Sequence, residues 1–240
     1  MRSSKYPEVE PGPDESLDDF LDGRLKLIQF RTGYRFSIDA VLLAQFVSIK
    51  RNDVVVDLGT GCGIIPMLLL LTEPVEHVFA LEIQPELAGQ AVRNARLNGF
   101  EHEVEIILGD LKHPPLAPSS ADVVICNPPY RPKESGRINP DPQKAIARHE
   151  VLSSLNDILD AASKTLRVKG RFAMIYPAAR LANLLIKMRG FNLEPKRLRV
   201  VYPSMRSDAK LVLIEASLGG RAGLKILPPL LDQGDFSITE

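Results

Sequence analysis

The stretch ICNPPY, residues 125–130, places an amide side chain, two prolines and a tyrosine directly after an apolar run. A proline has no N–H to donate to a sheet, and it pushes the preceding residue out of the helical region. We therefore expect a strand that stops in a stiff turn, with Asn127, the carbonyl of Pro128 and the ring of Tyr130 presented at its end and Pro129 holding the turn rigid.

Such a turn suits the activation of an amino group whose lone pair is delocalised, as in adenine or a glutamine amide. Two acceptors on its two N–H bonds favour pyramidalisation and free the lone pair for attack. The side-chain oxygen of Asn127 and the backbone oxygen of Pro128 can be these acceptors, and Tyr130 offers a flat face for stacking a base. The predicted catalytic residues are Asn127, Pro128, Pro129 and Tyr130.

A second group of candidate residues lies in DLGTGCG, where glycines at 59, 61 and 63 separate an apolar strand pattern from a helix pattern. Glycines at this place allow a tight turn and a close approach of a ligand to the backbone. A dinucleotide-binding fingerprint would have a glycine at position 64, where this chain has Ile64. The pattern therefore favours a cofactor with adenosine but no phosphate, such as S-adenosyl-L-methionine.

Acidic residues follow the next two predicted strands. Glu82 can accept both hydrogen bonds of a ribose diol, and Asp110 closes the run VEIILGD, where a simple turn-forming role is about equally plausible. Ligands of a parallel sheet bind at the carboxyl ends of its strands, so we expect the glycine turn, both acids and the Asn-Pro-Pro turn to share one site.

The elements that position these residues alternate along the chain. Strand patterns at 54–59, 77–82, 104–110, 121–127 and 171–177 are separated by helix patterns at 67–71, 85–99 and 151–166, and another helix pattern follows at 179–190. This alternation predicts an α/β fold with a doubly wound, mostly parallel sheet. Two final strands, 197–203 and 209–217, have no helix between them, which predicts an antiparallel pair at the sheet edge.

Residues 1–23 are rich in proline and acids and are predicted to be a mobile leader. One domain is expected over 24–240, with a hairpin or short strand pair and a Ser-capped helix in 24–50 and a tail in 218–240. The 240 residues are 45% hydrophobic, enough for one full core. The longest apolar run contains a proline and is too short for a bilayer, so no membrane role is expected. The cysteine usage fits the reducing cytoplasm.

The two cysteines, Cys62 and Cys126, are far apart, and the four histidines lack ligand spacing, so neither a disulfide framework nor a metal site is predicted. The formal net charge is zero, but residues 161–225 have fourteen Lys or Arg against three acids, while 52–130 have eleven acids against three bases. This split indicates a basic face that could follow a phosphate backbone, with ordinary solvated helix faces as the alternative.

Together, DLGTGCG, Glu82, Asp110 and NPPY resemble the class I S-adenosylmethionine-dependent methyltransferases that methylate amino groups, over residues 52–217. The segments GYRFSIDAVLLAQF, NPPYRPKESGRINPDPQKAIARHE and GGRAGLKILPPL are similar to the bacterial family that methylates N6 of adenosine-37 in valine tRNA. The resemblance implies a Rossmann-like, seven-stranded sheet whose last strand is antiparallel.

The same resemblance implies that Gly59 and Gly61 lie along the methionine part of the cofactor, that Glu82 holds its ribose, and that Asp110 and Leu111 meet its adenine. The candidate cofactor-binding residues are Phe36, Ser37, Asp39, Asp57, Gly59, Gly61, Gly63, Glu82, Ile83, Asp110, Leu111 and Asn127, the first three closing over the cofactor. The candidate substrate-binding residues are Tyr130, Arg131, Lys133 and Arg137, beside a flipped base.

The expected substrate is tRNA, and a monomer is favoured. NPPY alone also fits a glutamine methyltransferase acting on a release factor, or an enzyme acting on adenine in DNA. The glutamine enzymes resemble one another in having a larger helical domain before the cofactor strand, whereas about fifty residues precede it here. A catalytically idle binding module would lack one of Glu82, Asn127 or the glycines, and all are present.

Overall fold

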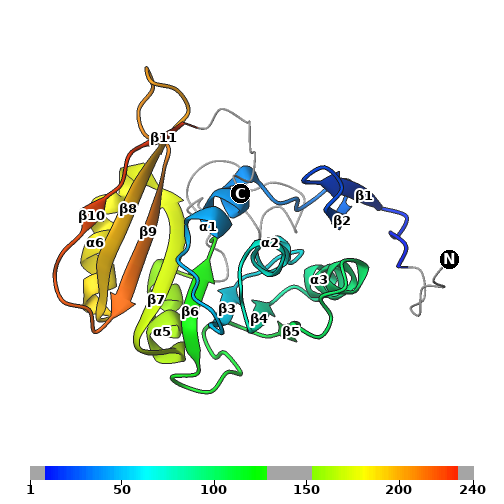
Figure 1. The fold of residues 1–240 in the computed structure, drawn as a ribbon, viewed down its shortest axis with the longest axis horizontal. Helices are drawn as coiled ribbons and strands as arrows, with labels where there is room; N and C mark the ends of the chain where they lie inside the picture. The colour runs from blue at the N-terminus through cyan, green and yellow to red at the C-terminus, as the bar shows by residue number, and fades with distance from the viewer. Residues whose placement is uncertain (1–8, 129–152, 232–240) are drawn as a thin grey trace.

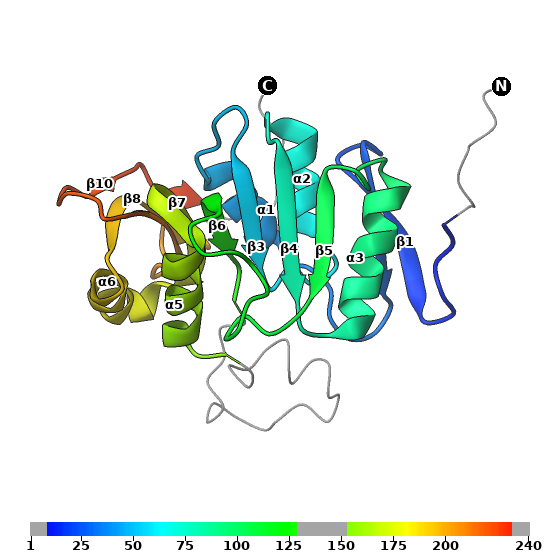
Figure 2. The ribbon, with the colours of Figure 1, turned by 90° about the horizontal axis from the view of Figure 1, so that it is seen from below.

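The structure is a computed structural model that describes residues 9–128 and 153–231. Its main sheet has the strand order β10-β8-β9-β7-β6-β3-β4-β5, and β11 also pairs with β8 (Figures 1 and 2). The strands of this sheet are β3 (Val54–Leu58), β4 (His77–Glu82), β5 (Val104–Leu108), β6 (Ala121–Cys126), β7 (Leu166–Pro177), β8 (Leu193–Tyr202), β9 (Leu211–Leu218), β10 (Lys225–Ile226) and β11 (Leu230–Leu231).

The predicted architecture is confirmed. Strands β3 to β7 run parallel to one another, and β9 lies antiparallel between β7 and β8. The seven longer strands therefore form a doubly wound sheet whose last long strand is antiparallel. The tail adds β10 and β11, two-residue strands that pair in parallel with β8.

Helices cover both faces of the sheet because alternate strand residues point to opposite sides. The helices are α1 (Ile38–Phe46), α2 (Ile64–Thr72), α3 (Pro85–Leu97), α5 (Leu155–Thr165) and α6 (Leu181–Gly190), with a 3₁₀ turn, η1 (Ala178–Arg180), before α6. Val55 packs in the core with α1 and α2, whereas its neighbour Val56 packs in the core with α5 and α6. Figure 1 shows α1, α2 and α3 on one side of the sheet and α5 on the other.

Local signals explain where several helices begin. Pro85 stands in the first turn of α3, where its missing N–H costs nothing. Helix α5 begins with a capping box, in which the Ser154 hydroxyl and the Asp157 carboxylate each accept from the other residue's backbone N–H. Ser37 occupies the N-cap of α1 as predicted, although its side chain makes no capping hydrogen bond.

The prediction that folded structure starts near residue 24 is wrong. Strand β1 (Glu15–Phe20) pairs antiparallel with β2 (Leu25–Phe30), so the hairpin takes its first strand from the predicted leader. The acidic composition of the leader concealed this strand, because Glu15 is buried against a cation of α3. Residues 1–8 lie outside the described part of the chain.

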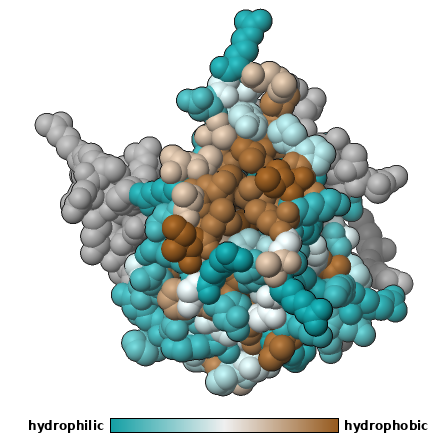
Figure 3. Space-filling view, turned by 90° about the vertical axis from the view of Figure 1, so that its left-hand side faces the viewer, coloured by the Kyte–Doolittle hydropathy of each residue, from teal (hydrophilic) through white to brown (hydrophobic). Residues whose placement is uncertain are grey.

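The outer edge of the sheet is covered by the tail. Strands β10 and β11 pair with β8 over two residues each, which shields part of its free edge. Ile186 of α6 and Ile226 of β10 are 72% and 67% exposed at this end of the molecule, where Figure 3 shows apolar side chains gathered. Within the described residues, no helix is long and apolar enough to cross a membrane.

Candidate functional site

The carboxyl ends of the central strands bring the predicted residues to one edge of the sheet. Leu58, the last residue of β3, is in register with Leu81 on one side and Cys126 on the other. The glycine turn after β3, Glu82 at the end of β4 and Asn127 after β6 are therefore neighbours along this edge, as expected. We call the side of the sheet where the parallel strands end its carboxyl edge, and the opposite side, where they begin, its amino edge.

Glu82 organises the glycine turn. Its Oε2 accepts a hydrogen bond from the Gly61 N–H at 2.8 Å, and its Oε1 accepts from the N–H groups of Ile83 and Gln84, each at 2.9 Å. Burial raises the pKa of Glu82, and the three N–H donors partly offset that rise. A carboxylate oxygen has two lone pairs, so Oε2 can still accept a hydroxyl of a bound ribose.

Asp57, the second-last residue of β3, carries a buried carboxyl group. It is fully buried, and within the described residues neither of its oxygens, nor the hydroxyl of Thr60 beside it, has a hydrogen-bond partner of acceptable geometry. Burial raises the pKa of Asp57 to about 7; the Glu82 charge adds to the rise and the nearby Thr60 hydroxyl opposes it. A buried anion of this kind fits a ligand that brings a positive charge.

The glycines of the turn differ in what surrounds them. All three have left-handed φ angles of +61° to +86°. A side chain on Gly59 would meet open space, whereas one on Gly63 would lie 3.2 Å from Ala91 Cβ of α3. Gly63, which was predicted to contact the cofactor, thus also permits the close packing of α2 against α3.

Gly61 is covered by Tyr34, a residue that sequence reasoning did not select. A Cβ on Gly61 would lie 2.7 Å from the ring and 2.8 Å from the hydroxyl oxygen of Tyr34. Burial, with the negative charges around it, raises the pKa of Tyr34 well above its usual value, so the phenol stays neutral and can donate a hydrogen bond. The segment between β2 and α1 therefore forms a wall over the glycine turn.

Asn94 of α3 was also missed, and it joins this wall to the glycine turn. Its side-chain N–H₂ donates to the Ile28 carbonyl at 3.0 Å and to the Cys62 carbonyl at 2.8 Å, and its Oδ1 accepts from the Ile28 N–H at 2.6 Å. One turn later, Asn98 makes the same pair of contacts with Lys26. The sequence signal that could have revealed Asn94 is its spacing: a polar residue stands at a core position of the helix.

The remaining predicted cofactor residues lie around this edge. Phe36 packs edge to face on Phe20 of the hairpin, with ring centroids 5.4 Å apart, and Asp39 lies in the first turn of α1. Asp110 accepts a hydrogen bond from the Lys112 N–H at 2.9 Å, the contact of a turn former. Leu111 is half-buried beside it. Their roles toward a cofactor stay predictions.

The predicted catalytic turn is described only in part. Asn127 is half-buried and Pro128 is buried, directly after β6. The predicted residues Pro129, Tyr130, Arg131, Lys133 and Arg137 lie outside the described residues.

Comparison with known proteins places the chain in a family. Residues 49–212 match the family model described as a methyltransferase domain. A protein of Porphyromonas gingivalis named tRNA1(Val) (adenine(37)-N6)-methyltransferase is 30% identical over 208 residues, covering 82% of this chain and 80% of its own. A protein of the same name from Aliivibrio salmonicida is 25% identical and covers 78% of each chain.

Solved structures agree on the fold. A predicted O-methyltransferase from Agrobacterium tumefaciens superposes with a TM-score of 0.65 at 25% identity, covering 81% of this chain and 88% of its own. An S-adenosylmethionine-dependent methyltransferase from Aquifex aeolicus superposes with a TM-score of 0.55 at 15% identity, covering 75% and 89%. The chain belongs to the methyltransferase-domain family and, within it, to the family of tRNA1(Val) (adenine(37)-N6)-methyltransferases.

Proposed function

We propose that this protein transfers a methyl group from S-adenosyl-L-methionine to N6 of an adenine in tRNA, at adenosine-37 of valine tRNA as the names of its relatives state for them. The observation that carries the proposal is the Asn127–Pro128 turn at the end of β6, on the same edge as the glycine turn and Glu82. Fold alone does not select the acceptor atom, since one structural neighbour is named for oxygen. An amide and a carbonyl acceptor side by side favour an amino group.

The residues of the site fit this cofactor. Glu82 retains acceptor capacity for a ribose, and Asp57 is a buried carboxyl without a hydrogen-bond partner among the described residues. A sulfonium or ammonium group nearby would stabilise the ionised form of Asp57. When bound, S-adenosyl-L-methionine supplies an electrophilic methyl group on a positively charged sulfur. Gly59 leaves open space against the backbone, which suits a close-lying ligand.

The chain's own residues would act mainly by position. The oxygens of Asn127 and Pro128 accept one hydrogen bond each from the two N–H groups of the target amino group. These contacts hold the lone pair of the nitrogen in line with the methyl carbon. With S-adenosyl-L-methionine bound, its sulfur would keep the electron pair of the broken S–C bond as the target nitrogen takes the methyl group. The nitrogen then carries a positive charge and loses one proton to water, so no strong base is required.

The finer assignments complete the proposal. Tyr130 would stack on the extruded adenine, and Arg131, Lys133 and Arg137 would contact its neighbouring phosphates. The site of action would be the cytoplasm, which agrees with two buried cysteines in the free form.

Methyl transfer itself can be tested directly. The purified protein is incubated with S-adenosyl-L-methionine carrying a labelled methyl group and, in separate reactions, with total tRNA, a release factor or duplex DNA. We expect label in tRNA, recovered as N6-methyladenosine after digestion to nucleosides. Label only in a glutamine of the release factor, or only in DNA, would replace this proposal by one of the alternatives.

Asn127→Ala should abolish turnover while leaving cofactor binding nearly intact. Loss of a preorganised polar contact of this kind lowers the rate by about 10² to 10³. The measurements are single-turnover methyl transfer to tRNA and calorimetric affinity for S-adenosylhomocysteine. A rate within a factor of a few of wild type would show that Asn127 does not touch the reacting nitrogen.

A further inference from the structure

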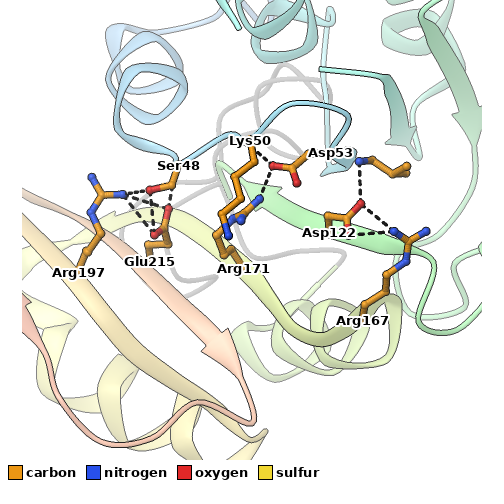
Figure 4. A network of polar contacts seen from close by, with 9 residues as sticks. Ser48, Lys50, Asp53, Asp122, Arg167, Arg171, Arg197 and Glu215 are labelled. Atoms are coloured by element: carbon orange, nitrogen blue, oxygen red, sulfur yellow. Dashed lines mark hydrogen bonds and ion pairs between the residues drawn. The ribbon is translucent and has the colours of Figure 1, made fainter. Parts of the chain in front are cut away.

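The two edges of the sheet are held by different kinds of contact. At the amino edge, ion pairs join segments near the starts of the strands, as Figure 4 shows in close view. Arg167 donates to both oxygens of Asp122 at 2.9 and 2.8 Å, and Arg171 is bonded to Asp53. The same two carboxylates accept backbone N–H groups at and just before the start of β3. These carboxylates therefore serve the fold of the sheet.

At the carboxyl edge, an aromatic ring holds the glycine turn. A Cβ on Gly61 would lie 2.7 Å from Cε1, 2.8 Å from the hydroxyl oxygen and 3.0 Å from Cζ of Tyr34. These distances are too short for any side chain, so the ring rests directly on the bare Cα of Gly61. Gly59 differs, because a Cβ there would have no described atom within 4 Å. Of the two glycines predicted to lie along the cofactor, Gly61 thus accommodates Tyr34 and Gly59 leaves its face open.

The segment that carries Tyr34 is anchored to the hairpin on both sides of this residue. Arg35 donates to Asp18 of β1 at 2.6 Å, and the Phe36 N–H donates to the side-chain oxygen of Gln29 of β2 at 3.2 Å. Asp18 also accepts from the Gln29 amide at 3.0 Å, which connects the two anchors. Because both of its neighbours in sequence are tied to the hairpin, the backbone of Tyr34 has little freedom, and its ring is directed onto the glycine turn.

Gly61 in turn sets the direction of a hydrogen bond to Glu82. Its N–H donates to Glu82 Oε2 at 2.8 Å from a left-handed backbone with a φ of +61°. Glycine has no side chain and can adopt many backbone conformations, so neighbouring groups must keep its peptide in this one. Asn94 bonds the carbonyl of the next residue, Cys62, at 2.8 Å, and the ring of Tyr34 covers Gly61 itself. Removal of the ring would free the peptide that orients Oε2.

The chemical character of Tyr34 suits this task. Burial, and after it the acidic groups nearby, raise the pKa of Tyr34 well above its usual value, so the phenol stays neutral. A neutral ring adds bulk beside Glu82 without a second negative charge, which would disfavour the ionised carboxylate. A lysine or arginine there would instead pair with Glu82 and use the acceptor capacity that a ribose needs.

We propose that Tyr34 is a positioning residue for the cofactor: its ring keeps the Gly61 peptide in place, and Gly61 keeps Glu82 oriented to accept a ribose hydroxyl of S-adenosyl-L-methionine. The inference rests on the proposed function and extends the role of Glu82 to the hairpin. The hairpin anchors Tyr34, Tyr34 holds Gly61, and Gly61 orients Glu82. Affinity for the ribose therefore depends on an aromatic ring at position 34, and the hydroxyl of that ring is dispensable.

The test compares ligands with and without the ribose diol. Calorimetry gives the affinity of each protein for S-adenosylhomocysteine and for its 2′,3′-dideoxy analogue. In the wild type, loss of the diol should weaken binding by about 10- to 100-fold, the range for a hydrogen bond to a charged group. In Tyr34→Ala, S-adenosylhomocysteine should bind about 10-fold more weakly or worse, and loss of the diol should weaken binding by less than about threefold.

Two further variants separate positioning from packing. Tyr34→Phe keeps the ring on Gly61 and should keep both wild-type affinities within about threefold. Phe191 follows α6, is half-buried like Tyr34, and packs against the core on the α5 and α6 face of the sheet. Phe191→Ala should therefore lower Tm through lost packing and leave the effect of the diol at its wild-type size.

A pair of glycines tests the contact without removing the ring. Gly61→Ala places a methyl group against Tyr34, whereas Gly99→Ala, at a left-handed φ of +76°, meets no described atom within 4 Å. Gly61→Ala should weaken binding of S-adenosylhomocysteine by about 10-fold, and Gly99→Ala should leave it unchanged. The double variant Gly61→Ala/Tyr34→Ala should bind about as weakly as Tyr34→Ala, since both changes break one contact.

An undiminished effect of the diol in Tyr34→Ala, or an equally reduced effect in Phe191→Ala, would overturn the proposal. So would losses that multiply in the double variant, or a loss in Tyr34→Phe as large as that in Tyr34→Ala. If Tyr34→Ala fails to fold, the comparison of Gly61→Ala with Gly99→Ala decides, and equal affinities in these two variants would count against the proposal. A wild type that is indifferent to the diol would instead refute the proposed role of Glu82, and the two failures are thus distinguishable.

Discussion

Asp57 is a residue whose environment a bound ligand would explain better than the fold alone does. Its carboxyl group is fully buried, and within the described residues neither oxygen is hydrogen-bonded. Hydrogen-bonded partners are the rule for buried polar groups, so an orphaned carboxyl next to a glycine turn indicates a binding role. Because burial raises its pKa to about 7, the group changes charge near neutral pH.

The variant Asp57→Asn should therefore be more stable than wild type when no cofactor is bound. The usual carboxyl pKa of 3.8 is raised to about 7 in the fold. Between these values the unfolded chain has lost the proton while the folded protein keeps it, so the free energy of unfolding falls as pH rises through that window and stays low above it. The variant lacks this titrating group, so the fall is absent. Above pH 7 we expect its free energy of unfolding to exceed that of wild type by roughly 1–3 kcal/mol.

Urea unfolding of both proteins at pH 5 and pH 8 measures this difference. Calorimetry should show the reverse effect on function: affinity for S-adenosyl-L-methionine rises with pH in the wild type, because the cation binds the ionised carboxylate, and is low and nearly flat in the variant. If the difference in unfolding free energy between Asp57→Asn and wild type were the same at pH 5 and pH 8, the raised pKa assigned to Asp57 would be wrong.

At the scale of elements, the β1–β2 hairpin is fixed to α3 by side chains. Glu15 of β1 accepts two hydrogen bonds of 2.6 Å from Arg93 and one of 2.8 Å from Gln90. The other strand of the hairpin, β2, is held by the side chains of Asn94 and Asn98, which exchange hydrogen bonds with its backbone as a neighbouring strand would. Because Asn94 also bonds the Cys62 carbonyl, the hairpin and the glycine turn are held in one arrangement.

Glu15→Gln should loosen this attachment in a pH-dependent way. The hydrogen bonds from Arg93, first, and those from Gly12 and Gln90 lower the pKa of Glu15 to about 2. Its stabilising effect is complete above the usual value of 4.5 and is lost as pH falls toward about 2. At pH 7 we expect the variant to lose about 2 kcal/mol, allowing for the partial exposure of Arg93.

The difference in unfolding free energy between Glu15→Gln and wild type, measured in urea, should shrink as the pH is lowered below about 4.5. Asp19→Asn is the matched control, since Asp19 is exposed on the same strand, and it should change stability by less than about 0.5 kcal/mol. A Glu15 variant that behaves like the Asp19 variant would show that the hairpin is not held by this ion pair.

At the scale of the whole molecule, the proposed cofactor site is assembled from segments far apart in the chain. Tyr34 comes from the segment after the hairpin, Asp57 from β3, Glu82 from β4 and Asn127 from the turn after β6. A ligand that contacts all of them binds the folded protein and not the unfolded chain, so it should stabilise the molecule as a unit.

S-adenosylhomocysteine at about 100 times its Kd should add about 2.7 kcal/mol, which corresponds to a rise in Tm of roughly 5–10 °C for a chain of this size. Nicotinamide adenine dinucleotide at the same concentration is the control and should leave Tm unchanged, because Ile64 replaces the glycine of a dinucleotide fingerprint. Differential scanning fluorimetry gives both values. An equal rise with the dinucleotide would argue for a pyrophosphate site.

Much of this molecule is encoded locally and could be predicted. Strand β4 was predicted at its observed bounds, and the turns after β3, β4 and β6 were recognised because glycine, acidic and proline residues interrupt apolar runs there. The alternation of these runs with amphipathic helices determined the doubly wound sheet. Register along the carboxyl edge then followed from the parallel order of the strands.

Tertiary structure alone decided the contacts between distant segments. Strand β1 was hidden because burial of Glu15 depends on Arg93, 78 positions later in the chain. The helical spacing of Asn94 marks it as a core position, but neither its bonds to Ile28 and Cys62 nor the placement of Tyr34 over Gly61 can be read from the sequence, because each contact joins residues that are far apart. Likewise, the sequence determined how many basic residues the C-terminal half contains, but only the tertiary structure brought Arg167, Arg171 and Arg197 to the acids Asp122, Asp53 and Glu215.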